Sequence, residues 1–251
     1  MESLVCVKRV PATDARIKIL PDGSGLDPSG VEYLLNPYDE FAVEEALKQK
    51  EAAGSGSVTA ICFGPQEAQK ELKGVLAMGA DSALLLKNPG AGDCDGATTA
   101  RILADAIRGR SFDLLFFGKQ AVDCDQHGVG PMTATLLGIP CISEVVKLEV
   151  AGGKVRAERE VEGGREIVEA PLPCAVTCHK GLNEPRYATL KGIMAAKKKP
   201  LEQVEVQITD PAVTLLSMKL PNPKPPGRIV GEGPEAVPEL VRALREEAKI
   251  L

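Results

Sequence analysis

Short apolar segments alternate with longer segments of helical periodicity over the first 140 residues, and this alternation restricts the fold more than any other feature. The expected strands cover residues 3–10, 57–64, 82–87 and 112–118. The expected helices cover residues 36–54, 65–80, 95–109 and 130–139. Because the strand segments are apolar without strict alternation, both of their faces are expected to be buried, as in a parallel sheet. The sequence therefore predicts an α/β fold, a parallel sheet with flanking helices.

The pattern changes after residue 140. Polar and apolar residues alternate up to residue 178, with Gly-Gly pairs at 152–153 and 163–164, which predicts a small antiparallel hairpin region of two or three strands. A loop then leads to a short helix that ends in "AAKKKP", and residues 201–226, with "PNPKPP", are expected to form an extended arm before a terminal amphipathic helix. We therefore expect an α/β domain over residues 1–200 and a C-terminal arm and helix over residues 201–251.

Composition excludes several classes of protein. The net charge is −5 and the chain has no Trp, five Phe and three Tyr, whereas nucleic-acid binding calls for excess basic charge and aromatic stacking platforms. The seven cysteines form no CxxC pair and the two histidines complete no metal constellation, so free thiols in a reducing compartment are expected. Without a long apolar run, direct membrane insertion is not expected. A cytoplasmic (bacterial) or mitochondrial matrix-like location follows as the expectation.

The stretch "GKQAVDCDQHGVGP", residues 118–131, follows an expected buried strand and opens an expected helix. Amides at a helix N-terminus bind anions, and Gly128 and Gly130 would let the backbone approach a phosphate. Asp123 or Asp125 could bond a ribose hydroxyl. The stretch matches neither GxGxxG nor a Walker A loop, so two interpretations stay open on spacing alone, a nucleotide-binding loop and a long flexible turn.

Other features leave a similar choice open. The "NP" and "GP" junctions at 36–37 and 64–65 could line the same sheet edge or only begin helices. The lysines of "AAKKKP" could be a solvated helix end or a contact surface for an acidic partner. Leu190 is expected in an exposed loop beside Tyr187. No catalytic constellation is present in the sequence, which favours a binder or carrier over a hydrolase or transferase.

Several blocks together resemble one family over nearly the whole chain. They are "VCVKRVP", "LNPYDEFAVEEALKQKE", "GKQAVDCDQHGVGPMTA", "EREVEGGREIVEAPLPCAVT" and "LNEPRYATLKGIMAAKKKP". This order of motifs is similar to the electron-transfer flavoprotein β subunit. The resemblance implies an adenine-nucleotide α-hydrolase-like fold and one half of an αβ heterodimer. It also implies a structural AMP in this subunit, while FAD is held mostly by the α subunit. Such a pair carries electrons from acyl-CoA dehydrogenase-type flavoenzymes to a membrane quinone oxidoreductase, and the β subunit is not itself an enzyme.

The resemblance also implies site residues. Backbone amides of residues 126–129 would hold the AMP phosphate, and Tyr38 is expected near the α-subunit flavin. The implied cofactor-binding residues are Cys6, Asn36, Pro37, Tyr38, Asp39, Phe63, Gly118, Lys119, Gln120, Ala121, Val122, Asp123, Cys124, Asp125, Gln126, His127, Gly128 and Val129. Leu190 would be the anchor of a "recognition loop" that docks the partner dehydrogenase. The implied docking residues are Tyr187, Leu190, Ile193, Met194, Lys197 and Lys198.

Two alternatives remain beside this reading. Electron-bifurcating relatives hold a second FAD in place of AMP and oxidise NADH, and their loop resembles "AIDGDTAQVGP". Gln126 and His127 here replace small residues of that loop, which favours AMP. An ATP pyrophosphatase would need a stretch such as SGGxDS, and the sequence has none. Residues 201–226 are expected to wrap on the α subunit.

Overall fold

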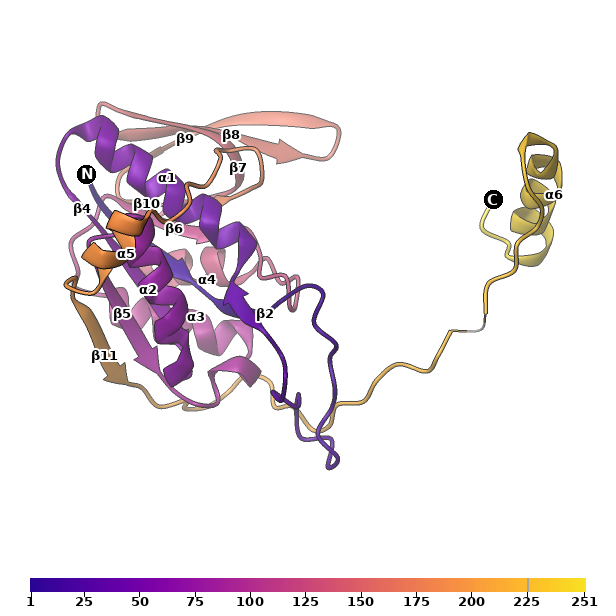
Figure 1. Cartoon of the computed structure of the whole chain (residues 1–251). Coiled ribbons are helices and arrows are strands. Elements are labelled where there is room, and N and C mark those ends of the chain that lie inside the picture. Colours follow the sequence, from indigo (N-terminus) through magenta and orange to yellow (C-terminus); the bar gives the residue numbers. More distant parts are fainter. Residues whose placement is uncertain (225) are drawn as a thin grey trace. The chain divides into compact units, whose positions relative to one another are not determined.

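The computed structural model of the chain describes residues 1–224 and 226–251 (Figure 1). These residues divide into a compact unit, Met1–Met218, and a smaller unit, Lys219–Leu251. The first unit extends beyond residue 200, where the sequence suggests a boundary. It does so because Leu201–Glu205 forms a strand that pairs along its whole length with Ser82–Lys87.

A nine-stranded sheet forms the centre of the first unit, with strand order β11-β5-β4-β1-β6-β10-β7-β8-β9. Its strands are β1 Glu2–Val7, β4 Ser57–Gly64, β5 Ser82–Lys87, β6 Leu114–Gly118, β7 Cys141–Ala151, β8 Lys154–Val161, β9 Gly164–Pro171, β10 Cys174–Cys178 and β11 Leu201–Glu205. Neighbours from β11 to β7 run parallel, whereas β7, β8 and β9 pair antiparallel. Strands β2 Arg9–Pro11 and β3 Tyr33–Leu35 form a separate antiparallel pair. The predicted α/β class with a hairpin region is confirmed.

The strands differ from the prediction in three places. The expected strand 3–10 divides into β1 and β2, which belong to different sheets. Strand β10 belongs to the parallel sheet, between β6 and β7, and not to the hairpin region. Its five residues are all buried, as expected of a central parallel strand, so the alternating pattern ends before it. Strand β11 pairs with β5 where the sequence predicts an extended arm, and four of its five residues are exposed because it lies at the sheet edge.

The helices of the first unit follow the predicted order. They are α1 Pro37–Ala53, α2 Gln69–Met78, α3 Gly96–Ile107, α4 Val129–Leu137 and α5 Leu190–Ala196, with short 3₁₀ turns at Gln66–Ala68 and Ala91–Asp93. Helix α1 begins at Pro37, whose fixed φ suits a first turn, and ends at Gly54, which has a φ of 71°. In the second unit, a 3₁₀ turn at Pro234–Ala236 is followed by α6 Val237–Arg242 and a π-helical turn at Ala243–Glu247.

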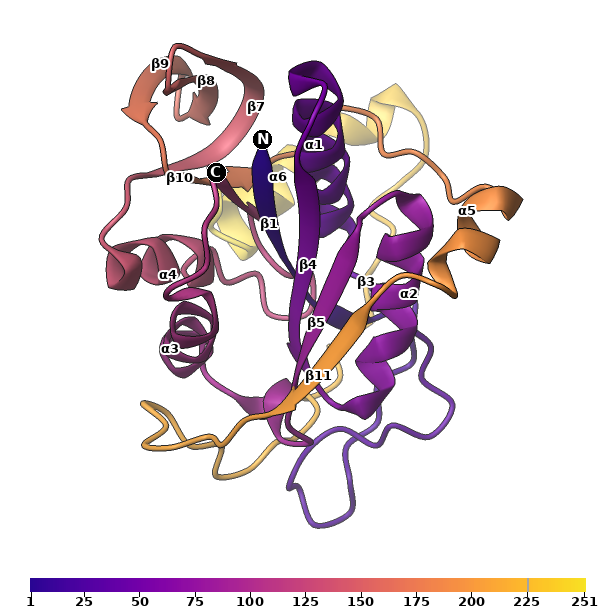
Figure 2. The same cartoon turned by 90° about the vertical axis from the view of Figure 1, so that its left-hand side faces the viewer.

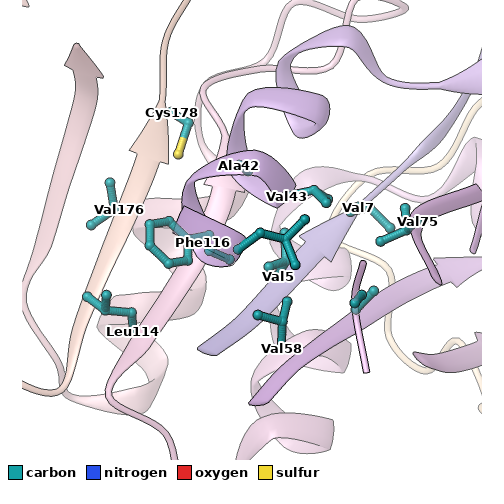
Figure 3. Packing of buried hydrophobic residues seen from close by; sticks show 14 of the residues in the cluster. Val5, Val7, Ala42, Val43, Val58, Val75, Leu114, Phe116, Val176 and Cys178 are labelled. Carbon is teal, nitrogen blue, oxygen red and sulfur yellow. The ribbon is translucent and has the colours of Figure 1, made fainter. Parts of the chain in front are cut away.

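Helices cover both faces of the sheet, α1 and α2 on one and α3 and α4 on the other (Figure 2). Alternate residues of β1 enter the two cores: Val5 and Val7 pack on the α1 side, and Leu4 and Cys6 pack on the α3 side. Figure 3 shows the first core, in which Val5 lies beside Phe116 of β6 and Val43 of α1. Sheets of this kind bind ligands at the carboxyl ends of their strands. Among the described residues, no helix combines the length and apolarity needed to cross a membrane.

Candidate functional site

A cleft lies at the carboxyl ends of β1, β4 and β6, and α1, α3 and α4 contribute residues from their N-terminal ends. Its empty space is about 790 Å³, which includes the part open to solvent. Phe63, Leu103 and Phe117 form apolar walls. The lining residues are Cys6, Val7, Lys8, Asn36, Asp39, Phe63, Ala91, Cys94, Gly96, Thr99, Leu103, Phe117, Gly118, Lys119, Gln120, Ala121, Cys124, Gln126, Val129 and Gly130.

Asn36 joins the start of α1 to the loop after β6. Its Nδ2 donates to Gln120 O at 2.8 Å and to Asp39 Oδ1 at 2.9 Å, and its Oδ1 accepts from Val122 N at 3.1 Å. The sequence suggests a helix cap at Asn36, but its side chain makes no cap bond to α1. The buried amide instead satisfies backbone groups of the loop, which would otherwise be left without partners.

Asp39 is the second polar group of the cleft floor, and its carboxylate accepts only from uncharged donors. Lys8 N donates to Oδ2 at 2.6 Å, and Gly118 N donates to Oδ1 at 3.1 Å. Burial raises the pKa of Asp39 to about 7, against the opposing effect of hydrogen bonds from Asn36, Lys8 and Gly118. The carboxyl group therefore changes its charge near neutral pH, at the junction of β1, α1 and β6.

Gly118 ends β6 directly against the first turn of α1. A Cβ at this position would overlap Asp39 Oδ1 and would lie 2.7 Å from the carbonyl carbon of Tyr38. Only glycine lets the loop after β6 pass so close to α1. The glycine that ends this strand is therefore required by packing.

The N-termini of α3 and α4 both border the cleft. Among the described residues, no acceptor is found for the backbone amides of residues 126–130, which lead into α4. Such free amides, together with the helix dipole, favour an anion. Gly130 approaches Phe117 and Thr177, where a Cβ would lie 2.9 Å from Thr177 Cγ2. Its small size thus serves the packing of α4 on the sheet.

Helix α3 is capped at the cleft mouth by Asp95. Its Oδ1 accepts from Thr98 N at 2.9 Å, and its Oδ2 accepts from Ala212 N at 2.9 Å. Burial opposes ionisation, but these hydrogen bonds outweigh it and lower the pKa of Asp95 to about 2. At the next residue, Gly96, an added Cβ would lie 2.9 Å from Gln126 Cδ, so the Gln126 side chain rests on the first turn of α3.

Eleven of the predicted cofactor-binding residues line the cleft. They are Cys6, Asn36, Asp39, Phe63, Gly118, Lys119, Gln120, Ala121, Cys124, Gln126 and Val129. Pro37, Tyr38, Val122, Asp123, Asp125, His127 and Gly128 do not line it.

Several of the predicted residues outside the lining have other partners. Asp123 pairs with Lys8 Nζ at 2.7 Å, and His127 Nδ1 lies 3.5 Å from Glu144 Oε1. Asp125, with a φ of 49°, accepts from the Gln120 side chain. Asp123 and Asp125 therefore both have partners within the chain. A ribose contact through either carboxylate would have to replace one of these bonds.

Sequence reasoning missed part of the lining. The missed residues are Val7, Lys8, Ala91, Cys94, Gly96, Thr99, Leu103 and Phe117, whereas Gly130 was expected beside a phosphate and does line the cleft. Five of the missed residues come from the segment before α3 and from α3 itself, namely Ala91, Cys94, Gly96, Thr99 and Leu103. A signal is present in "DCDGATT", where a helix-capping Asp followed by small residues comes after a parallel strand.

Tyr38 lies outside the cleft, beside a small polar cluster. Its ring meets the His179 ring edge-on at 6.1 Å between centroids, and Lys119 Nζ is 5.4 Å from the Tyr38 ring centroid. Lys119 Nζ is also 3.0 Å from His179 Nε2, so Lys119 joins this cluster to the cleft.

The six predicted docking residues lie together on and next to α5. Tyr187 is 95% exposed and Leu190 is 83% exposed, and Ile193, Met194, Lys197 and Lys198 are also exposed. Large apolar side chains so fully in solvent, and so close together, are typical of an interaction site. We refer to residues 187–194 as the 187–194 segment.

The described residues hold no cluster of three or more His, Cys, Asp or Glu side chains that could bind a metal ion. All seven cysteines are free thiols. Burial raises the pKa of the Cys6 thiol in the cleft wall well above its usual value, so this sulfur acts as a small apolar group.

Comparison with known proteins agrees with this architecture. A family model for the electron transfer flavoprotein domain matches residues 25–209. The chain is 40% identical over 260 residues to the electron transfer flavoprotein subunit beta of Bacillus subtilis, with all of both chains covered. It is 39% identical to the subunit of the same name from Mus musculus, over 100% of this chain and 99% of that one. The human subunit is 37% identical over 98% of both chains. The chain therefore belongs to the electron transfer flavoprotein family and is a member of its β subunits.

Proposed function

We propose that this β subunit binds AMP in the cleft as a structural element and forms a heterodimer whose α subunit holds the redox-active FAD. The heterodimer takes electrons from acyl-CoA dehydrogenase-type flavoenzymes and passes them to a membrane quinone oxidoreductase. In this role the β subunit is a carrier component and catalyses no reaction of its own. With seven free cysteines it would work where thiols stay reduced, in a bacterial cytoplasm or a mitochondrial matrix.

The observation that carries the AMP proposal is the combination of apolar walls and free amides in one cleft. Phe63, Leu103 and Phe117 offer surfaces for an adenine ring. Of residues 126–130, Gln126, Val129 and Gly130 line the cleft, and their amides offer donors for one phosphate. Lys8 and Lys119 add positive charge to the lining. The phosphate contact through residues 126–129 and the ribose contact through Asp123 or Asp125 belong to this proposal.

The docking proposal rests on the exposure of the 187–194 segment. Leu190 would enter an apolar pocket of the partner flavoenzyme, with Tyr187, Ile193 and Met194 around it and Lys197 and Lys198 meeting acidic groups. Burial of one aliphatic side chain contributes about 1.5–3 kcal/mol. That is enough to orient a transient complex without locking it.

The second candidate is an electron-bifurcating β subunit with FAD in the cleft and NADH as the electron donor. This candidate is supported by the D-x-D and VGP residues, which the loop of this chain shares with the loop of the bifurcating relatives. Gln126 and His127, which replace the small residues of the bifurcating loop, favour AMP.

Acid denaturation of the purified αβ heterodimer separates the two candidates, with the released nucleotides identified by chromatography and mass. The carrier with AMP gives one FAD and one AMP per heterodimer. Two FAD and no AMP would replace the first candidate by the second. Release of neither nucleotide from the β cleft, with one FAD from the α subunit, would contradict both.

A further inference from the structure

The 187–194 segment projects apolar side chains into solvent, yet the residues around it are firmly attached to the body of the protein. A loop rich in exposed apolar groups would be expected to fold back on itself and hide them. Here the chain on each side of Tyr187 and Leu190 is tied to α1 or α2, and α5 packs along α2 (Figure 2).

Arg186, the residue before Tyr187, is held by two carboxylates of α1 at once. Its Nε and Nη2 donate to the two oxygens of Glu44 at 2.8 and 3.0 Å. Its Nη1 and Nη2 donate to the two oxygens of Glu51 at 2.6 and 3.1 Å. The backbone N of Arg186 also donates to Glu44 Oε2 at 3.1 Å. Paired bonds of this type fix orientation as well as distance, because the guanidinium is planar and rigid.

Asn183 provides a second tie to α1, three residues earlier. Its Nδ2 donates to Phe41 O at 3.0 Å and to Glu45 Oε2 at 3.0 Å. Glu44 and Glu45 are 5% and 2% exposed, so two neighbouring carboxylates of α1 are largely buried by this contact. Burial of charged groups is costly unless partners are supplied. Arg186 and Asn183 supply them.

On the far side of Leu190, the attachment is to α2. An added Cβ at Gly192 would overlap Ala77 O, so the backbone of α5 touches the backbone of α2. Lys199 Nζ then donates to Leu76 O at 2.9 Å and Ala80 O at 2.6 Å, which satisfies carbonyls at the C-terminal end of α2. Leu190 thus lies between two fixed points on α1, at Asn183 and Arg186, and two contacts with the α2 region, at Gly192 and Lys199.

We propose that Arg186 is a positioning residue, which holds the 187–194 segment in its docking shape before the partner flavoenzyme arrives. The inference rests on the proposed docking role of Leu190. The Arg186 pairs with Glu44 and Glu51 fix the chain directly before Tyr187, so they act on docking as well as on stability. A segment fixed in advance loses less conformational freedom on binding, and the association is correspondingly tighter. Loss of the two pairs lets Tyr187 and Leu190 sample other positions.

The test uses the αβ heterodimer and an acyl-CoA dehydrogenase reduced by its substrate. The rate of electron transfer is measured against heterodimer concentration for the parent, Arg186→Ala and Arg186→Lys. Arg186→Ala is expected to raise KM about tenfold and to change kcat less than about twofold. Arg186→Lys is expected to fall between, because one ammonium cannot bond both carboxylates as a fork. Hydrogen exchange of amides 187–196 in the free heterodimer is expected to accelerate in Arg186→Ala.

Arg108→Ala is the matched control, because Arg108 pairs with Asp105 on the exposed surface of α3, away from the 187–194 segment. It is expected to leave KM and the exchange pattern at parent values. Leu190→Ala tests the docking role itself. If Leu190→Ala raises KM and Arg186→Ala does not, the positioning role is wrong while docking stands.

If neither variant changes KM, the docking function fails and the inference fails with it. An unchanged exchange rate at amides 187–196 in Arg186→Ala would also overturn it. Should Arg186→Ala not assemble, Glu51→Gln replaces it, because Glu51 is mostly exposed and only one of the two pairs is weakened. A KM equal to that of the parent in Glu51→Gln would then count against the inference.

Discussion

The cleft and the 187–194 segment are built on the same helix with opposite patterns of burial. At the start of α1, Asn36 and Asp39 are polar and only 1% and 5% exposed. One to four turns further along, Glu44 and Glu51 hold Arg186, beyond which Tyr187 and Leu190 are apolar and almost fully exposed. The cleft buries polar groups to shape a loop, whereas the segment exposes apolar groups on a fixed backbone. Substitutions in the cleft should therefore lower stability, and those in the segment should lower affinity for a partner.

Asn36→Ala is expected to have the largest effect on stability. It removes three hydrogen bonds and leaves Gln120 O and Val122 N without their partner in a partly buried position. Each buried polar group left unsatisfied costs about 1–3 kcal/mol, so a loss of about 4 kcal/mol is expected. Thermal or denaturant unfolding of the heterodimer measures it. A loss below about 1 kcal/mol would mean that the loop after β6 does not depend on Asn36.

Gly118→Ala is expected to lower the free energy of unfolding by about 3 kcal/mol, because the new methyl group overlaps Asp39 and Tyr38. Gly74→Ala in α2 is the matched control, since nothing lies within 4 Å of its added Cβ. The control is expected to stabilise the protein by about 0.5–1 kcal/mol, as Ala favours a helix over Gly. Equal changes in the free energy of unfolding of the two variants would show that the close approach at Gly118 does not cause the destabilisation.

The charge of Asp39 provides a test that depends on pH. Its folded-state pKa of about 7 lies above the ordinary value of 3.8, so its contribution to stability is full below pH 3.8 and is lost as pH rises through 7. Between pH 5 and pH 8, this loss is about 2–3 kcal/mol, at 1.36 kcal/mol for each pH unit. The comparison is with Asp39→Asn, which cannot ionise.

The Asp39→Asn variant carries a constant cost at every pH, because its amide must face one of the backbone donors of Lys8 and Gly118. The parent is expected to lose stability more steeply than this variant between pH 5 and pH 8. Lys8, Lys119 and Asp123 are present in both proteins, and the two chains differ only at residue 39. Parallel stability curves would show that Asp39 keeps one charge state over this range.

The sequence predicts the parts of the fold that depend on local pattern. Strands β4 and β5 have the bounds that their apolar runs predict, and α1 begins at Pro37 and ends before Gly54 as its turn residues predict. The sequence does not predict that β10 and β11 belong to the parallel sheet. Their places in it depend on pairing with β6 and β5, which are far away in the sequence. Local pattern carries no information on such pairs.

The residues of the cleft could likewise be predicted only where they are close together in the sequence. Residues in one continuous loop, such as Gly118 and Gln126, were found because strand, loop and helix follow one another in the sequence. Phe117 and Leu103 were missed because an apolar residue in a core position gives no sign that it faces a cleft. The roles of Asn36 and Arg186 were not predicted either. Each depends on carboxylates or carbonyls of a distant segment, which only the folded chain brings within hydrogen-bond distance.

Leu190→Ala is expected to have the smallest effect on stability and a large effect on docking. Because the side chain is 83% exposed, its removal should change the free energy of unfolding by less than about 0.5 kcal/mol. The same removal should raise KM for a partner dehydrogenase about tenfold or more, since one buried aliphatic group contributes about 1.5–3 kcal/mol and 1.4 kcal/mol corresponds to a factor of ten. Ile167→Ala, at an exposed apolar residue of β9, is the control and should change neither. If Leu190→Ala lowered stability as Asn36→Ala does, the segment would be part of the core, and the contrast between the two ends of α1 would disappear.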